Sequence, residues 1–222
     1  QSVINQTYPN VEYIIIDGGS TDGTLDIIKK YEDYIDYWVS EKDKGIYDAM
    51  NKGVQLSLGM WVYFLGSDDT IFEDSFNNVY PFLDIGKRVI YGNVILKSNG
   101  RIFDGVFSDY KLTFVRNICH QAIFYKREVF QFITYDPNYQ VLGDYALNLY
   151  LFSPEHFKYV PLNIAIYNDR GISNLTKDIT FNKEKKNILE KNIFKRNKKI
   201  KVLYCIYDML RRLKGEIVGG TL

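Results

Sequence analysis

The sequence has few of the residues that build metal clusters or disulfide frameworks. Its 222 residues include two cysteines and two histidines, and Cys119 and Cys205 lie far apart in the chain. These residues predict neither a zinc cluster nor a disulfide scaffold. Isolated cysteines are typical of a reducing cytosol, so we expect a cytoplasmic protein.

Long apolar runs, internal repeats and low-complexity stretches are also missing. The longest apolar runs, such as Tyr13–Ile16 and Trp61–Leu65, are strand-sized and far below the ~18 residues of a bilayer-spanning helix. Hydrophobic residues make up 46% of the chain and charged residues 25%, which excludes a disordered chain. The length fits one α/β domain with a short appendage.

The charge is balanced overall but unevenly distributed. The chain has 28 Lys and Arg and 27 Asp and Glu, a net +1. Residues 183–214 hold 12 basic and 3 acidic residues, a net +9, which leaves −8 for the remainder. From Lys177 on, apolar residues recur at helical spacing, so we expect an acidic body, residues 1–175, and a basic helical extension, residues 176–222.

Three partners for this extension are open on sequence alone. Basic amphipathic helices bind anionic lipid surfaces, which would place the protein peripherally on the inner face of the cell membrane. The helices could equally pack on the domain or on a sister subunit in a homodimer. Nucleic acid is disfavoured, because residues 183–214 lack the interleaved aromatic pattern of a base-stacking platform and the acidic body would repel phosphates.

The first third of the chain alternates strand and helix patterns. Val11–Ile16, Asp36–Glu41 and Trp61–Leu65 are predicted strands, and helical periodicity follows each of the first two. Such alternation predicts a doubly wound parallel sheet whose strands end at one edge. Ser2–Pro9 resembles the last turn of a helix followed by a proline turn, so we expect a preceding strand upstream of Gln1.

The second half has a mixed and partly antiparallel pattern. Val89–Leu96 and Ile102–Phe107 flank Asn99-Gly100, which predicts a hairpin with a two-residue type I′ turn. We expect a further strand near Cys119–Tyr125 and a helix over about Val141–Phe152.

Four segments could carry chemistry, and each also has a purely structural interpretation. Asp17–Gly23 lies where doubly wound sheets bind nucleotides, but it lacks the G-x-G-x-x-G spacing and could be a glycine turn. Asp68 and Asp69 are adjacent carboxylates that suit Mg²⁺ or Mn²⁺, or else begin a helix. His120 fits a buried core position, and Asp144 fits either a helix N-terminus or a general base.

The segments together resemble glycosyltransferase family 2. The resemblance lies in their order along the chain: Gln6–Glu12, Ile16–Thr24, Ser40–Gly53 and Gly66–Asp69. Cys119-His120-Gln121 and Gly143-Asp144-Tyr145 follow in the order that this family uses. The resemblance implies a GT-A fold: a doubly wound mixed α/β sheet with a parallel nucleotide-binding half, an antiparallel acceptor half and C-terminal helices.

The resemblance also implies roles for individual residues. Asp144 is the expected general base and Asp69 the expected ligand of Mg²⁺ or Mn²⁺, while His120 and Gln121 lie near the diphosphate or the acceptor. The expected donor-binding residues are Asp17, Gly19, Lys44, Asn51 and Asp68.

The function implied is inverting transfer of a sugar from a nucleoside diphosphate to a hydroxyl of a glycan or lipid-linked acceptor, in cell-surface polysaccharide synthesis. Three features depart from the family pattern. Gly18 and Gly66 stand where many members have a polar or acidic residue, and the first strand, which helps to hold the nucleotide, is expected to be missing. The alternative is therefore a catalytically silent remnant that binds a nucleotide or a partner, and this fragment could be inactive in either case.

Overall fold

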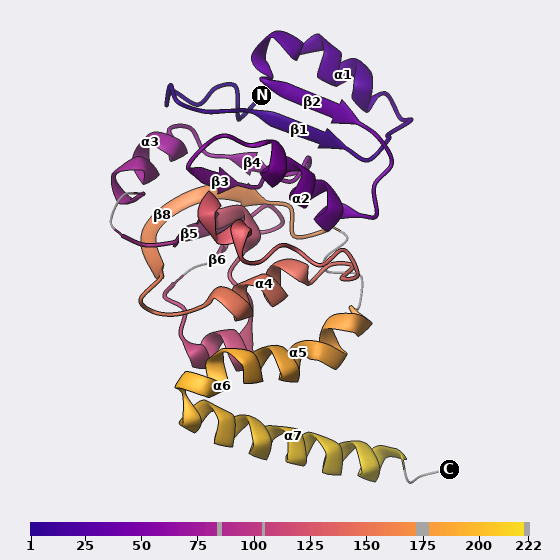
Figure 1. Ribbon diagram of the computed structural model, residues 1–222, viewed down its shortest axis with the longest axis vertical. Coiled ribbons are helices and arrows are strands. Elements are labelled where there is room, and N and C mark those ends of the chain that lie inside the picture. The colour runs from indigo at the N-terminus through magenta and orange to yellow at the C-terminus, as the bar shows by residue number, and fades with distance from the viewer. Residues whose placement is uncertain (84–85, 104, 172–177, 220–222) are drawn as a thin grey trace.

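The computed structural model describes residues 1–83, 86–103, 105–171 and 178–219 of the chain (Figure 1). At one end of the molecule, strands β1 (Ile14–Asp17) and β2 (Tyr37–Ser40) form a parallel pair. Helix α1 (Thr24–Lys30) connects them, and α2 (Ile46–Leu56) follows β2. This is the predicted strand–helix–strand–helix order.

The larger sheet has six strands and is mostly antiparallel. Its order is β3-β7-β5-β8-β4, with β6 paired to β5, and only β5 and β8 run parallel. Helix α3 (Ser75–Val79) packs near β8. The strand bounds are β3 (Trp61–Tyr63), β4 (Thr70–Ile71), β5 (Val89–Leu96), β6 (Ile102–Phe103), β7 (Ile123–Lys126) and β8 (Phe157–Tyr167).

The fold class is confirmed, since the chain is a mixed α/β protein with C-terminal helices. One detail of the sheet differs from the prediction. The third strand, β3, pairs antiparallel with β7, whereas β1 and β2 pair with each other. Tyr63 stacks on Phe124 of β7 at 4.7 Å between ring centroids. Periodicity predicts a strand but not its partner, and here long-range ring packing accompanies the pairing.

The β5–β6 hairpin exists, but its turn is not the predicted two-residue type. The Leu96 N–H donates to the Arg101 carbonyl, so four residues, 97–100, form the loop. Of these, Gly100 alone has a positive φ, at 70°. Ser98 donates from its N–H and hydroxyl to Asp169, and the Asn99 side chain accepts from Arg101 N–H. These side-chain bonds favour the longer loop over a type I′ turn.

The strand predicted near Cys119–Tyr125 begins later than expected. Residues His120–Ala122 form one turn of 3₁₀ helix, and β7 starts at Ile123. His120 and Gln121 therefore precede the strand. Their side chains do not have to point alternately to the two faces of the sheet, as strand residues do. Helix α4 (Gly143–Leu151) lies within the predicted range.

The C-terminal segment forms helices α5 (Ile179–Lys191), α6 (Ile193–Arg196) and α7 (Lys198–Gly219), so the predicted C-terminal helices are confirmed. Side chains from α5 and α6 are buried in the same core as those of α4, and they include Phe181, Ile188, Leu189, Ile193 and Phe194. The predicted boundary between residues 175 and 176 lies outside the described residues. Among the described helices, none has the length and apolar character needed to cross a bilayer.

Candidate functional site

Asp17 ends β1 and organises the loop that follows it. Its carboxylate accepts hydrogen bonds from the Gly19 and Ser20 N–H groups at 3.0 and 2.9 Å, and from the Ser20 and Ser40 hydroxyls at 2.5 and 2.6 Å. The Ser20 hydroxyl is the largest cause that lowers the pKa of Asp17 to about 2. Asp17 is therefore a fixed carboxylate at the carboxyl end of a strand, as predicted.

Glycines in the same loop leave room for close backbone approach. Gly19 has a φ of 87°, which other residues rarely adopt. At Gly18, a Cβ atom would lie 2.7 Å from Asp43 Oδ2, so the glycine that departs from the family pattern lets the Asp43 carboxylate lie close to the backbone here.

The two donor-binding residues predicted on the next loop and helix have different surroundings. Lys44 is exposed before α2, and its backbone N–H donates to Asp48 at 3.0 Å. The Asn51 side chain bonds both backbone groups of Tyr135, donating to the carbonyl at 2.8 Å and accepting from the N–H at 3.0 Å. Asn51 thus positions the 135 loop rather than pointing a free amide toward a donor.

Asp69 is a buried carboxylate in the turn after β3. Its Oδ1 accepts from the Asn168 N–H at 2.7 Å, and its Oδ2 accepts from the Gln121 side chain at 2.8 Å. Asp68 is exposed and accepts from the Asn168 side chain at 2.9 Å. No salt bridge to either carboxylate occurs among the residues that the structure describes.

The surroundings of Asp69 favour either the protonated, neutral form of its carboxyl group or a carboxylate with a cation nearby. Burial is the main cause that raises the pKa of Asp69, and the charge of Asp68 raises it further. At Gly66, a Cβ atom would lie 2.7 Å from Asp69 Oδ2, so this departure from the family pattern also makes room for the acid. Within residues 1–83, 86–103, 105–171 and 178–219, no three His, Cys, Asp or Glu side chains gather as a metal-binding group.

His120 is a neutral ring in an aromatic cluster. Its Nε2 lies 2.9 Å from the Tyr135 hydroxyl, and its ring stacks on Phe64 at 5.3 Å between centroids. Burial lowers the pKa of His120 to about 4. His120 and Gln121 are neighbours in one turn, but Gln121 contacts Asp69 whereas His120 contacts Tyr135.

Asp144 lies in the first turn of α4, partly buried. Its Oδ2 accepts from the Asn117 amide at 2.7 Å, and its Oδ1 accepts from the Tyr47 hydroxyl at 3.3 Å. Burial raises the pKa of Asp144 to about 6, although both hydrogen bonds act in the opposite direction. Gly143 is needed beside it, because a Cβ there would lie 2.8 Å from the Tyr47 ring.

A short chain of contacts connects the two halves of the site. Tyr47, which donates to Asp144, stacks on Tyr135 at 5.4 Å, and Tyr135 bonds His120 in the turn that also carries Gln121. Cys119 in this turn has a pKa raised by burial and also by the charges of Asp69 and Asp144. Both carboxylates therefore lie near the 119–121 turn.

Several residues that hold the site could not be recognised from motifs. Tyr47, Asn117 and Tyr135 contact the predicted residues, but a lone Tyr or Asn carries no functional signal in a sequence. Asp178 is 1% exposed, and its Oδ2 accepts from three consecutive N–H groups, those of residues 140–142, at 2.9–3.1 Å. Asp178 holds the loop before Asp144. The sequence marks it only as an acid directly before a predicted helix.

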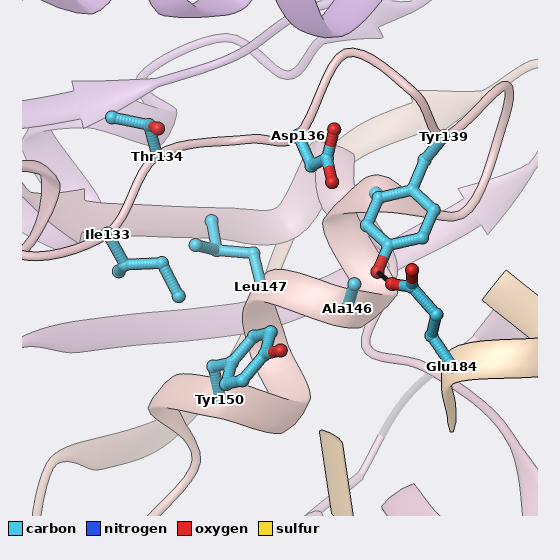
Figure 2. Close-up of a pocket in the computed structure, with 9 residues that line it drawn as sticks. Ile133, Thr134, Asp136, Tyr139, Ala146, Leu147, Tyr150 and Glu184 are labelled. Carbon is cyan, nitrogen blue, oxygen red and sulfur yellow. Dashed lines mark hydrogen bonds between the residues drawn. The ribbon is translucent and has the colours of Figure 1, made fainter. Parts of the chain in front are cut away.

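A separate pocket lies against another face of α4 (Figure 2). Asp136, Tyr139, Tyr150 and Glu184 line it with Gly143 and apolar residues, and Tyr139 donates to Glu184 at 2.5 Å. None of the predicted site residues lines this pocket, so its role is not assigned by the motifs.

Comparisons with known proteins identify the family of the chain. The model of glycosyl transferase family 2 matches residues 1–143. A PGL/p-HBAD biosynthesis glycosyltransferase from Mycobacterium bovis is 40% identical over 192 residues, 81% of this chain and 74% of that relative. The Escherichia coli UDP-Glc:alpha-D-GlcNAc-diphosphoundecaprenol beta-1,3-glucosyltransferase WfaP is 34% identical over 110 residues, 49% of this chain and 43% of that relative.

Solved structures share the fold at low sequence identity. S. aureus TarS 1-349 in complex with UDP-GlcNAc has a TM-score of 0.67 and 16% identity, over 86% of this chain and 60% of that chain. The mannosyltransferase PcManGT from Pyrobaculum calidifontis, in complex with GDP-Man and Mn²⁺, has a TM-score of 0.57 and 14% identity. The match covers 77% of this chain and 52% of that chain. Since the family model matches most of the sequence and a curated relative is 40% identical, this chain belongs to glycosyl transferase family 2.

Proposed function

We propose that the chain transfers a sugar, with inversion, from a nucleoside diphosphate sugar to a hydroxyl of a glycan or lipid-linked acceptor in cell-surface polysaccharide or glycolipid synthesis. The curated relatives are glycosyltransferases, and one is named for p-HBAD and PGL biosynthesis. Structural neighbours are complexes with UDP-GlcNAc and GDP-Man. These names support a nucleotide-sugar donor.

The surroundings of Asp144 are the observation that carries the proposal. A partly buried carboxylate with a pKa of about 6 is ionised at neutral pH and still basic enough to accept a proton. Asp144 takes the proton of the acceptor hydroxyl as that oxygen bonds to the anomeric carbon. The bond from this carbon to the diphosphate breaks, and its electron pair stays on the diphosphate oxygen.

Asp69 is the proposed ligand of Mg²⁺ or Mn²⁺. Each of its oxygens accepts one hydrogen bond and keeps a second lone pair, and no described cation balances the Asp68–Asp69 pair. When bound, the ion would offset the negative charge on the departing diphosphate. Since no described residue adds a third acid to this pair, donor oxygens and water would complete the coordination of the ion.

The first test is Asp144→Asn, which keeps the side-chain shape but removes the base. We expect donor binding to stay nearly unchanged and transfer to fall by about two to four powers of ten. Calorimetry measures donor binding, and single-turnover assays measure transfer. The exposed carboxylate Glu190 of α5 supplies the matched control, Glu190→Gln, which should change neither quantity. Parallel loss of binding and turnover would instead assign Asp144 a structural role.

The second test is Asp69→Ala. We expect metal-dependent donor binding to be lost, because the ligand that joins the ion to the protein is gone. Titration with UDP-sugars and GDP-sugars, with and without Mn²⁺, measures this effect, and Asp33→Ala at an exposed position is the control. Transfer by the unchanged protein in excess chelator would contradict the metal role.

A catalytically silent remnant that binds a nucleotide or a partner is the second candidate. The observation that favours it is that both Asp69 oxygens, and both ends of the Asn51 amide, are already bound by protein groups. Calorimetry with UDP and Mn²⁺, combined with an assay for hydrolysis of the nucleotide sugar, separates the candidates. Binding without any turnover would support the remnant.

A further inference from the structure

Helix α7 exposes a broad apolar face. Seven large apolar side chains are each between 47% and 59% exposed. Figure 1 shows α7 along the end of the molecule opposite β1 and β2. At 100° per residue these positions span an arc of about 160° around the helix. We call this set the α7 face: Val202, Leu203, Ile206, Tyr207, Met209, Leu210 and Leu213.

The side of α7 next to the Tyr207 edge of this arc is fixed to the domain. Ile200 is 6% exposed within the core, and Tyr204 packs on Phe194 at 5.3 Å between ring centroids. At the junction with α6, Arg196 pairs with Asp109. These contacts hold the start of α7 on the domain. Lys201, Cys205 and Arg211, which lie outside the arc, are exposed as well, so the α7 face belongs to a helix that the described domain leaves largely uncovered.

The apolar surface continues onto the neighbouring segment. Phe114 contacts Tyr207 at 5.9 Å and Tyr110 at 5.1 Å between ring centroids. Tyr110 and Val115 are 55% and 60% exposed. Two segments nearly a hundred residues apart in sequence thus contribute to one apolar surface, which a flat partner could cover.

Basic residues gather at the same end of the molecule, at the start of α7. Lys195, Lys198, Lys199 and Lys201 are all exposed. No Asp or Glu occurs between residues 191 and 207. An apolar arc combined with exposed lysines is the composition of helices that lie in a bilayer interface.

We propose that the α7 face docks on the surface of an anionic lipid bilayer. The apolar side chains would enter the acyl boundary, and the lysines would contact lipid phosphates. The remainder of the chain outside residues 183–214 carries a net −8, so an anionic surface would repel it and favour contact through α7. The inference does not depend on the proposed transfer reaction.

A second copy of this chain fits the α7 face less well. Residues 198–214 hold six basic residues and one acid, so two such helices side by side would repel each other. An arc of about 160° is also wider than the seam of a two-stranded coiled coil, and it would stay partly exposed. A bilayer interface has the complementary charge and covers the whole arc.

The test is co-flotation of the full chain with vesicles of phosphatidylcholine alone or mixed with phosphatidylglycerol. We expect binding to the mixed vesicles that weakens with added salt. The double variant Ile206→Glu/Leu210→Glu and the quadruple change of the four lysines to Gln should each weaken it by about tenfold or more. The matched control Ile27→Glu/Leu58→Glu alters exposed apolar residues elsewhere and should bind normally.

Three results would overturn the proposal. They are no flotation with anionic vesicles, equal flotation of the α7 variants, and a stable dimer in sedimentation velocity that Ile206→Glu/Leu210→Glu dissociates. Circular dichroism shows whether the variants keep their fold. Calorimetry with nucleotide sugars in the absence of vesicles checks the donor site separately, so failure of either proposal is distinguishable from failure of the other.

Discussion

The hydrogen-bond donors to Asp144 include the backbone N–H of Tyr145 and the side chains of Tyr47 and Asn117, all of them neutral, and burial raises its pKa to about 6. The proposed base works as a carboxylate, so protonation inactivates it. We therefore expect kcat/KM to fall about tenfold per pH unit below pH 6 and to level off above it. A pH–rate profile measures this acid limb.

The substitution Asn117→Leu is a second test of whether the pKa of Asp144 sets the acid limb of the pH–rate profile. The Asn117 amide lowers the pKa of Asp144, so its removal should move the acid limb of the profile toward higher pH. A merely structural role for Asn117 would lower the rate at every pH without moving the limb. Asn148 donates to Asn117 at 2.9 Å and accepts from Tyr125 at 2.8 Å, so Asn148 is left unchanged in this experiment.

At the scale of single elements, α4 is held at both ends by residues of the C-terminal segment. Asp178 accepts from the backbone of residues 140–142, before the helix. Asn192 donates from Nδ2 to the carbonyls of Leu149, Tyr150 and Phe152 at the other end. These contacts satisfy helix-end groups that otherwise need water or a local cap.

We expect Asp178→Ala to lower the free energy of unfolding by roughly 2–4 kcal/mol, because buried N–H groups lose a charged acceptor. Hydrogen bonding holds the pKa of Asp178 below its ordinary value despite burial. This contribution is present above the unfolded-state pKa and is lost as the pH falls through the folded-state pKa. Urea unfolding at neutral and acidic pH measures both effects, and Asp33→Ala at an exposed position is the control. A loss equal at both pH values would contradict the charge argument.

Local patterns in the sequence predicted some elements well. The β5 range agrees with its largely apolar sequence, because a strand buried on both faces can be recognised without knowledge of its partner. The partner of β3, the four-residue hairpin loop and the 3₁₀ turn at His120 were missed, since each depends on distant side chains. The hydrogen bond between Asp69 and Gln121, which are 52 residues apart, could not be predicted from the order of the motifs along the chain.

For the whole molecule, the sequence predicted the α/β class, the acidic body and the basic helices. It left the partner of those helices open, because composition does not say which face of a helix the domain covers. The structure buries Ile200 and exposes Leu203, Ile206 and Leu210 on the same helix. The exposure of individual side chains thus shows which face of the helix is uncovered, which a count of charges cannot show.

The Asn192 contacts tie the far end of the molecule to the proposed base. Asn192 directly precedes α6, and α6 leads to α7 within two residues. A displacement of α6 must therefore break three hydrogen bonds to the end of α4 or carry that helix along. A load applied to α7 would therefore pass through α6 and the Asn192 side chain to the helix that carries Asp144.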